Sequence, residues 1–233
     1  MELMKKATVR KYIVNSDVFL REDDVSFYLL GAYMTDGNIN DTKHHVSFSI
    51  ISKDRDWIEN IRDIICPNKP LYDRLNCCAI EVSDIDAMSW LISYGCTPRK
   101  SKTLLLEKTI PEKYHRDFIR GLIDGDGSIT SCPYKKVKNN KEYWYTKRTI
   151  YLCSASKIFI EQISSLIPSN ISCHIITLSP KNSIIRGKEV IATCNQYRLQ
   201  FNDSNAQKLL TWLYYPEHKL SMPRKNQLAL SLI

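Results

Sequence analysis

An internal repeat constrains the fold of this chain more than any other feature. Residues 28–39 return as residues 118–129, with the Gly, Asp-Gly and final Ile positions identical. Residues 57–61 then match residues 159–163, and a Pro-Arg-Lys tripeptide follows late in each copy. Because elements that recur in the same order indicate repeated structural units, the 233 residues are expected to form two similar halves.

Hydrophobic periodicity predicts the same order of elements in each half. Apolar residues at helical spacing mark the helices, and alternation of apolar with polar residues marks the strands. In the first half, the predicted helices are 25–36, 53–66 and 85–94, and the predicted strands are 45–52, 71–75 and 79–83. In the second half, a helix ends at Asp126, further helices are 157–167 and 206–214, and the strands are 129–134, 143–154, 171–178 and 191–201.

We therefore predict an α+β fold made of two pseudo-symmetric αββαββα halves, each with one antiparallel sheet. The first half, with an N-terminal extension and the linker, is expected to cover residues 1–105 and the second half residues 106–233. Basic residues and Pro111 interrupt the pattern between residues 98 and 112, where we place the linker.

The two Asp-Gly pairs stand at the ends of predicted helices. Gly37 and Gly127 are expected to be ordinary helix C-caps. The aspartates need another explanation, because a carboxylate at a helix C-terminus faces the negative end of the helix dipole. A bound cation would reverse that penalty, so Asp36 and Asp126 are candidate metal ligands.

Small residues explain how these two carboxylates could meet. Gly31 and Thr35 lie four apart on one predicted helix, and Gly121 and Gly125 lie four apart on the other. Each pair shares one helix face, so the two helices are expected to pack closely about a pseudo-two-fold axis. Oxygen ligands at the bottom of that interface suit Mg²⁺ or Mn²⁺, which could activate water for attack on a phosphodiester.

Residues 29–37 and 119–127 resemble the two copies of the motif that names the LAGLIDADG homing endonuclease family, of the single-chain, double-motif type. The likeness extends to the element order and to nearly all of the chain after about residue 20. The resemblance implies that the motif helices pack between two halves, and that Asp36 and Asp126 bind the metal. The other acidic motif position is Asp124 in the second copy but Met34 in the first, so Asp124 is expected to have a structural or polar-capping role.

The resemblance also implies a catalytic basic residue late in each half, and the repeated Pro-Arg-Lys makes Lys100 and Lys225 the candidates. Their expected role is to stabilise charge on the phosphorane or to order the attacking water. The implied function is a site-specific double-strand break in a long DNA target. Two alternatives on the same scaffold are an intron RNA maturase and a non-catalytic DNA-binding regulator, and retention of both aspartates favours the nuclease.

The sheets are expected to form a saddle that binds DNA, because a two-stranded ribbon fits the major groove and alternate residues on one face can reach base edges. The hairpin of the second half, with its predicted turn at Asn139-Asn140, is the richest in basic and aromatic residues. Its candidates are Lys135, Lys136, Lys138, Lys141, Lys147 and Arg148. Further DNA-binding candidates are Lys43, His44, Ser47, Ser49, Arg74, Asn76, Lys188, Gln196, Arg198 and Gln200.

Composition agrees with a nucleic-acid partner. Lys and Arg number 33 against 25 Asp and Glu, a net charge of +8. No apolar run approaches the roughly 20 residues that span a bilayer, and eight cysteines without a Cys-x-x-Cys pair favour reduced thiols over zinc. An intein is not expected, because the chain starts at Met1 and has no terminal Asn. We expect an intracellular monomer located wherever its DNA resides, in a prokaryotic cytoplasm or an organelle.

Overall fold

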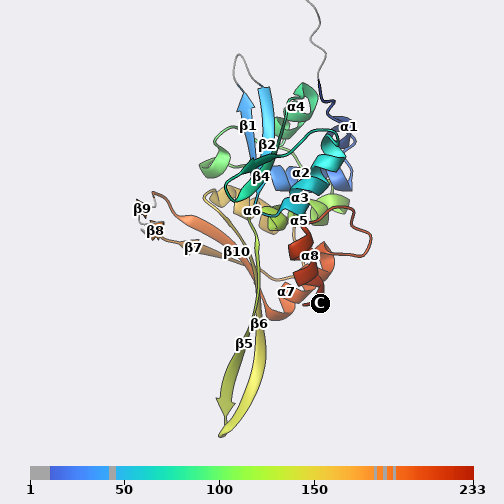
Figure 1. The fold of residues 1–233 in the computed structure, drawn as a ribbon. Helices are drawn as coiled ribbons and strands as arrows, with labels where there is room; N and C mark the ends of the chain where they lie inside the picture. The colour runs from blue at the N-terminus through green and yellow to red at the C-terminus, as the bar shows by residue number, and fades with distance from the viewer. Residues whose placement is uncertain (1–10, 42–45, 181–182, 186–187, 191–192) are drawn as a thin grey trace, which may run out of the picture.

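The computed structural model contains two four-stranded antiparallel sheets whose helices meet between them (Figure 1). It describes residues 11–41, 46–180, 183–185, 188–190 and 193–233, with the side chains of residues 183–185 and 188–190 left out. Buried residues from both halves form one continuous hydrophobic core. The predicted α+β class is confirmed, while the boundary between residues 105 and 106 stays a prediction.

The first half contains four helices and the sheet β1-β2-β4-β3. Its helices are α1 (Asp17–Leu20), α2 (Asp24–Thr35), α3 (Arg55–Ile65) and α4 (Ile85–Ser93), and its strands are β1 (Gly37–Asp41), β2 (Val46–Ser52), β3 (Tyr72–Arg74) and β4 (Cys77–Val82). The 3-10 turns η1 (Lys100–Lys102) and η2 (Glu112–Tyr114) lie in the connection to the second half.

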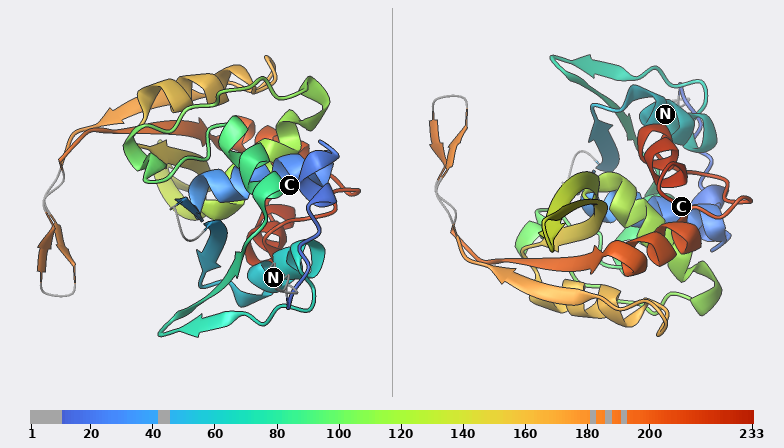
Figure 2. Two further views of the ribbon diagram at one scale, coloured as in Figure 1. Left: turned by 90° about the horizontal axis from the view of Figure 1, so that it is seen from above. Right: turned by 90° about the horizontal axis from the view of Figure 1, so that it is seen from below.

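The second half repeats this order around the sheet β5-β6-β10-β7. Its helices are α5 (His115–Gly125), α6 (Lys157–Ser165), α7 (Asp203–Leu213) and α8 (Pro223–Leu230), and its strands are β5 (Ser128–Lys138), β6 (Lys141–Ser154), β7 (His174–Leu178) and β10 (Gln196–Asn202). A separate small hairpin, β8 (Ser183–Ile185) and β9 (Lys188–Val190), lies beyond the ends of β7 and β10 (Figure 2).

The long hairpin β5–β6 projects from the helical layer as a two-stranded arm (Figure 1). Its turn residues Asn139 and Asn140 both have positive φ, 52° and 59°, as the predicted tight turn requires. The arm is longer than the sequence pattern predicted. Both of its faces carry polar residues, so the alternation of apolar and polar residues that marks a strand is missing there. The short helix α1, the strand β1 and the C-terminal helix α8 were not predicted either.

Helices α2 and α5 pack side by side at the centre of the molecule (Figure 2), at the close approach predicted from their small residues. A Cβ added to Gly31 would overlap the backbone oxygen of Phe118, and one added to Gly121 would overlap the backbone oxygen of Tyr28. Only glycine leaves room for contact between the two backbones. This packing fixes where the two helices end relative to each other.

Within the described residues, no helix is long and apolar enough to cross a membrane.

Candidate active site

Asp36 and Asp126 are the C-cap residues of α2 and α5, and their backbones are nearly identical. Their φ and ψ angles are −90° and −2° for Asp36, and −92° and −2° for Asp126. The Asp36 Oδ2 atom lies 3.6 Å from the place where a Cβ on Gly125 would stand, so its carboxylate faces the end of α5. The structure therefore brings the two predicted ligands together at the interface of the halves.

Gly37 and Gly127 directly follow the C-cap residues of α2 and α5, as expected, but neither has the positive φ that Gly95 has among the described glycines. Both positions are instead limited by space. A Cβ on Gly37 would overlap the Tyr33 backbone, and a Cβ on Gly127 would lie 2.5 Å from the Ile123 Cα atom. The chain turns back tightly against the last helical turn at each site, which leaves no room for a side chain.

The surroundings of the two carboxylates disfavour their ionised forms. Burial, followed by repulsion from Asp126, raises the pKa of Asp36 from its ordinary 3.8 to about 6, although Lys225 and Lys100 act to lower it. Burial likewise raises the pKa of Asp126, and the same two lysines oppose that rise. Among the described residues, no side chain or backbone N–H donates a hydrogen bond to either carboxylate. A divalent cation fits this pair, because carboxylate oxygens that accept no hydrogen bond can act as its ligands.

Lys225 reaches from α8 to the carbonyl end of α5. Its Nζ atom donates to the backbone oxygens of Ile123, Asp124 and Gly127 at 2.7 Å each, and it lies 3.1 Å from that of Gly125. A cation at a helix C-terminus stabilises the exposed carbonyls and opposes the dipole. The lysine therefore offsets part of the penalty that made an aspartate at this place an anomaly in the sequence.

Lys100 occupies the matching position in the first half, where its Nζ atom donates to the backbone oxygen of Gly37. Both lysines are buried, with 8% of Lys100 and 6% of Lys225 exposed, and burial lowers the pKa of each ammonium group. Their ammonium groups hold the ends of the motif helices in this structure. Contact of either lysine with a phosphate or a water stays a prediction.

Asp124 has the structural role expected of it. Its buried carboxylate accepts hydrogen bonds from the hydroxyls of Tyr28 (2.7 Å) and Tyr214 (2.6 Å) and from the backbone N–H of Met222 (2.7 Å). Because Tyr28 belongs to α2 and Met222 precedes α8, this one carboxylate links the two halves and the start of the helix that carries Lys225. Met34, its repeat partner, is buried among apolar residues.

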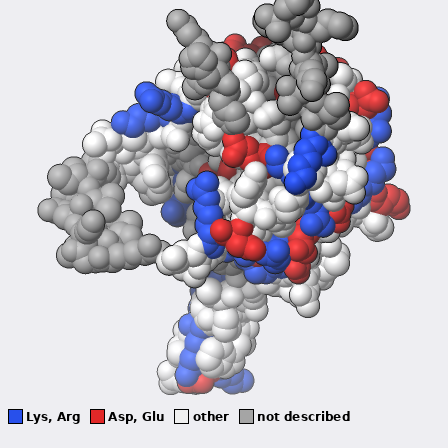
Figure 3. All heavy atoms as spheres, turned by 45° about the horizontal axis from the view of Figure 1, so that its top comes forward, with Lys and Arg blue, Asp and Glu red and all other residues white. Residues whose placement is uncertain are grey.

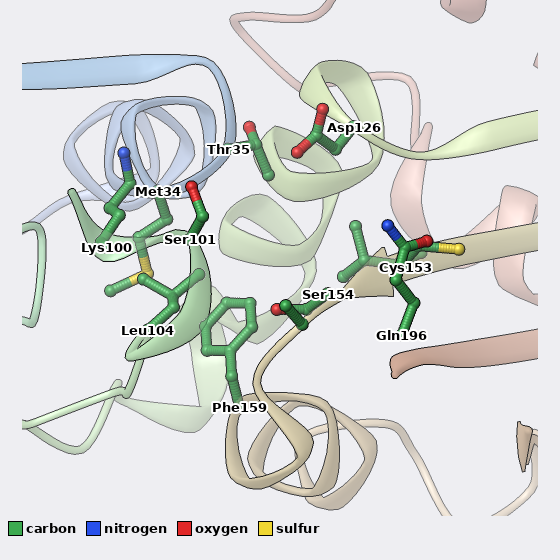
Figure 4. Close-up of a pocket in the computed structure, with 12 residues that line it drawn as sticks. Met34, Thr35, Lys100, Ser101, Leu104, Asp126, Cys153, Ser154, Phe159 and Gln196 are labelled. Atoms are coloured by element: carbon green, nitrogen blue, oxygen red, sulfur yellow. The ribbon is translucent and has the colours of Figure 1, made fainter. Parts of the chain in front are cut away.

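A cavity of about 220 Å³ opens beside Asp126 (Figure 4). Thr35 and Lys100 border it from the first half, and Ser154 and Gln196 border it from the second sheet. In Figure 4 the Asp126 carboxylate stands at the end of α5, with Thr35 next to it and Lys100 across the opening. The cavity therefore joins Asp126 to residues of the second sheet.

The predicted DNA-binding residues of the first sheet differ in their accessibility. Arg74 and Asn76 are exposed at the β3–β4 turn. Ser47 was expected to be accessible, but it is buried and donates a hydrogen bond to Glu81 at 2.6 Å. Ser49 stands on the face opposite the core, as the pairing of Ile50 with Ile80 requires. Lys43 and His44 lie outside the described residues.

Strand register separates the predicted residues of the second sheet into two faces. The pairs Ile129–Ile150 and Leu152–Leu199 mark the core face. By alternation, Lys135 and Arg148 belong to that face, and Lys135 forms an ion pair with Glu142. The other face carries Lys136, Lys138, Lys141, Lys147, Gln196, Arg198 and Gln200. Lys188 lies in β9, where side chains are not described.

Tyr151 is a residue of this outer face that the sequence interpretation missed. The Arg198 guanidinium carbon lies 4.2 Å from its ring centroid. The signal was present, because Tyr151 follows Tyr143 and Tyr145 at even spacing and so shares their face. Counting alternate residues along the strand from the apolar Ile150 would also have assigned the basic residues to the two faces.

Comparison with solved structures identifies the fold, although no protein-family model and no curated protein sequence matches the chain. I-SmaMI, a meganuclease bound to uncleaveable DNA, aligns with a TM-score of 0.56 at 11% identity, over 88% of this chain and 87% of its own. The I-LtrWI LAGLIDADG homing endonuclease bound to target DNA aligns with a TM-score of 0.53 at 11% identity, over 94% and 89%. This chain has the LAGLIDADG homing endonuclease fold.

A third solved structure agrees with this LAGLIDADG fold. The LAGLIDADG meganuclease I-AabMI bound to uncleaved DNA aligns with a TM-score of 0.54 at 15% identity, over 88% of this chain and 89% of its own. The resemblance carried by residues 29–37 and 119–127 is therefore confirmed for the fold.

The carboxylate pair predicts an unusual dependence of stability on pH in metal-free protein. The pKa of Asp36 in the folded protein (about 6) lies above its ordinary 3.8, so ionisation of this carboxyl lowers the stability of the folded state. This loss of stability is absent below about pH 4, grows as the pH rises and is complete above about pH 6. Asp36→Asn should therefore stabilise the protein at pH 7.5 by about 2–3 kcal/mol, at 1.36 kcal/mol per pKa unit. Thermal melting in EDTA at pH 7.5 and at pH 4.5 measures this difference, which should shrink at the lower pH. An equal gain at both pH values would contradict the account.

Proposed function

We propose that this chain is a site-specific homing endonuclease that makes a double-strand break in a long DNA target by metal-dependent phosphodiester hydrolysis. The observation that carries the proposal is the pair of carboxylates, Asp36 and Asp126, brought together at the ends of α2 and α5 without a hydrogen-bond donor among the described residues. A DNA partner is supported by I-SmaMI, I-LtrWI and I-AabMI, which were all solved with DNA bound.

Asp36 and Asp126 would hold the metal, for which we propose Mg²⁺ or Mn²⁺. When bound, such an ion lowers the pKa of water and stabilises charge on the phosphate. No group of three or more acidic, His or Cys side chains within the described residues could hold a metal. The two aspartates therefore suit an ion that takes its other ligands from phosphate and water. I-SmaMI has also been solved with uncleaved DNA in the presence of calcium ions.

Lys100 and Lys225 would prepare the site in two ways. Each holds the carbonyl end of one motif helix, which fixes the backbone of the aspartate beside it. Each also lowers the pKa of both aspartates, which favours the ionised carboxylates that a cation needs. Because their positive charge lies close to both aspartates, we propose that the two lysines also stabilise the charge that develops during hydrolysis.

The alternatives of an RNA maturase and of a non-catalytic regulator need no such pair. Neither role requires two carboxylates held together against their own repulsion, a placement that costs stability at neutral pH. We therefore assign the site to hydrolysis.

The halves are proposed to work as one molecule, because residues 1–105 and 106–233 each supply one carboxylate. Light scattering at low micromolar concentration should give the mass of one chain, 27.1 kDa, without DNA. A stable dimer of twice that mass would contradict this prediction.

Selection from a randomised library of DNA duplexes tests the function. Molecules cut by the protein in Mg²⁺ should converge on one long sequence, with both strands broken, and the same incubation in EDTA should yield none. Failure to enrich any sequence, with protein shown to be folded, would refute the nuclease assignment.

A further inference from the structure

The outer face of the second sheet carries a cluster of cations and aromatic rings, which we call the basic face. Cross-strand pairs place Lys136 opposite Tyr143, Lys138 opposite Lys141, and Tyr134 opposite Tyr145. The remaining members, on the same face by alternation, are Lys147, Tyr151 and Arg198. The apolar residues that pack on the helices are on the other face, so the basic face is turned away from the core.

Two of these cations lie against aromatic rings. Tyr134 and Tyr145 are stacked with their centroids 5.6 Å apart, and the Lys136 Nζ atom lies 5.5 Å and 5.6 Å from them. Arg198 lies over Tyr151 in the same way, and its buried Nε atom has no hydrogen-bond partner. Side chains that are already ordered lose less entropy on binding, so these cations are prepared for an anionic partner.

The cations of the basic face are not paired with carboxylates in the described part of the chain. None of its five cations forms an ion pair within the described part of the chain, while Lys135, on the opposite face of the same arm, is paired with Glu142. Figure 3 shows Lys and Arg side chains along the projecting arm. An unpaired cation releases counterions from DNA more effectively than one already held by a carboxylate.

The first sheet presents a different surface at the equivalent place. Its outer face carries Asn38, Asn40 and Ser49, with Glu81 opposite Ser49 and Arg74 as its cation among the described strand residues. The pairing β1–β2 covers five residues, against eleven in β5–β6. At about 3.3 Å per residue, the longer ribbon spans roughly one turn of duplex and the shorter one roughly half a turn.

We propose that the chain binds its duplex unequally, with the basic face of the second half making most of the phosphate contacts. The first half then contributes mainly hydrogen bonds from amides and hydroxyls, which serve sequence reading more than affinity. This inference rests on the proposed function, because it assumes that double-stranded DNA lies along both sheets. It adds that the salt dependence of binding arises mostly from one half of the molecule.

Salt titration of binding tests the inequality. The probe is a fluorescein-labelled 40-base-pair duplex of random sequence, followed by anisotropy from 50 to 300 mM KCl in EDTA. Replacing Lys136, Lys138, Lys141 and Lys147 together with Gln should flatten the slope of log K against log salt by about 3, since each phosphate contact contributes about 0.9. Affinity at 100 mM KCl should fall by more than about a hundredfold.

Two variants provide matched controls. Lys135→Gln changes the same arm on its other face and should leave the slope unchanged, and Arg74→Gln should change it by no more than about 1. A slope change below 1 for the fourfold variant, or an equal change for Arg74→Gln, would overturn the inference. Cleavage by the unaltered protein in Mg²⁺ is measured separately. If the unaltered protein cuts DNA and the fourfold variant keeps the same salt slope, only the proposal of unequal binding is refuted. Failure of the unaltered protein to bind the duplex refutes both proposals.

Discussion

Asp36→Asn and Asp126→Asn should each reduce double-strand cleavage by at least about a thousandfold, or roughly 4 kcal/mol of transition-state stabilisation, while DNA binding survives. Each change removes a negative oxygen ligand but preserves the size of the side chain, so the packing of α2 against α5 is kept. Binding in EDTA should be equal or tighter, because a carboxylate that faces phosphates repels them when no cation lies between.

Single-turnover cleavage of the selected duplex, with both strands labelled, measures the loss for each variant. Asp56→Asn is the matched control, since Asp56 is an exposed carboxylate on α3 and its loss should leave the rate unchanged. Cutting by either active-site variant at near-normal rate would contradict the paired-ligand assignment. Loss of folding would favour a purely structural role for these helix ends.

Gly121→Ala should destabilise the protein by about 3 kcal/mol or more, although helix propensity alone predicts a gain of about 1 kcal/mol. The added Cβ would overlap the Tyr28 backbone oxygen, and a backbone cannot rotate away as a side chain can. The helices must separate, which also moves Asp36 away from Asp126. At about 2–4 °C per kcal/mol for a chain of this size, the melting temperature should fall by about 10 °C.

Gly125→Ala tests whether the loss at Gly121 comes from overlap with a backbone atom, or whether α5 tolerates no side chain at any of its glycines. Its Cβ would overlap only the side chain of Thr35, so Thr35→Gly should restore most of the stability lost. The double variant Gly121→Ala with Thr35→Gly should show no such rescue. A stabilised Gly121→Ala protein would show that the two helices are not in contact at this point.

The sequence was sufficient to predict those features that depend on local pattern. Repetition of the Asp-Gly pair indicated two halves, and the spacing of Gly121 and Gly125 indicated which helix faces meet. The position of Asp36 and Asp126 then followed, because both residues end the two helices that pack about the pseudo-two-fold axis. The hydrogen bonds of Asp124 confirm the structural role that was expected of it.

Features that depend on long-range contact could not be predicted in the same way. Lys225 binds carbonyls about a hundred residues earlier in the chain, and no local pattern shows that its ammonium group would be enclosed by them. Gly37 was expected to end a helix, but the sequence does not show that a side chain there would overlap the Tyr33 backbone. The basic run of the arm was treated as one surface, whereas the strand alternation turns Lys135 and Arg148 toward the other face.

The most direct test of the central claim is the anomalous scattering of Mn²⁺ in crystals of the protein with its selected duplex. The account predicts manganese density bonded to carboxylate oxygens of both Asp36 and Asp126 and to phosphates of the DNA. Manganese held elsewhere, or a duplex whose scissile phosphates lie far from these two carboxylates, would contradict it.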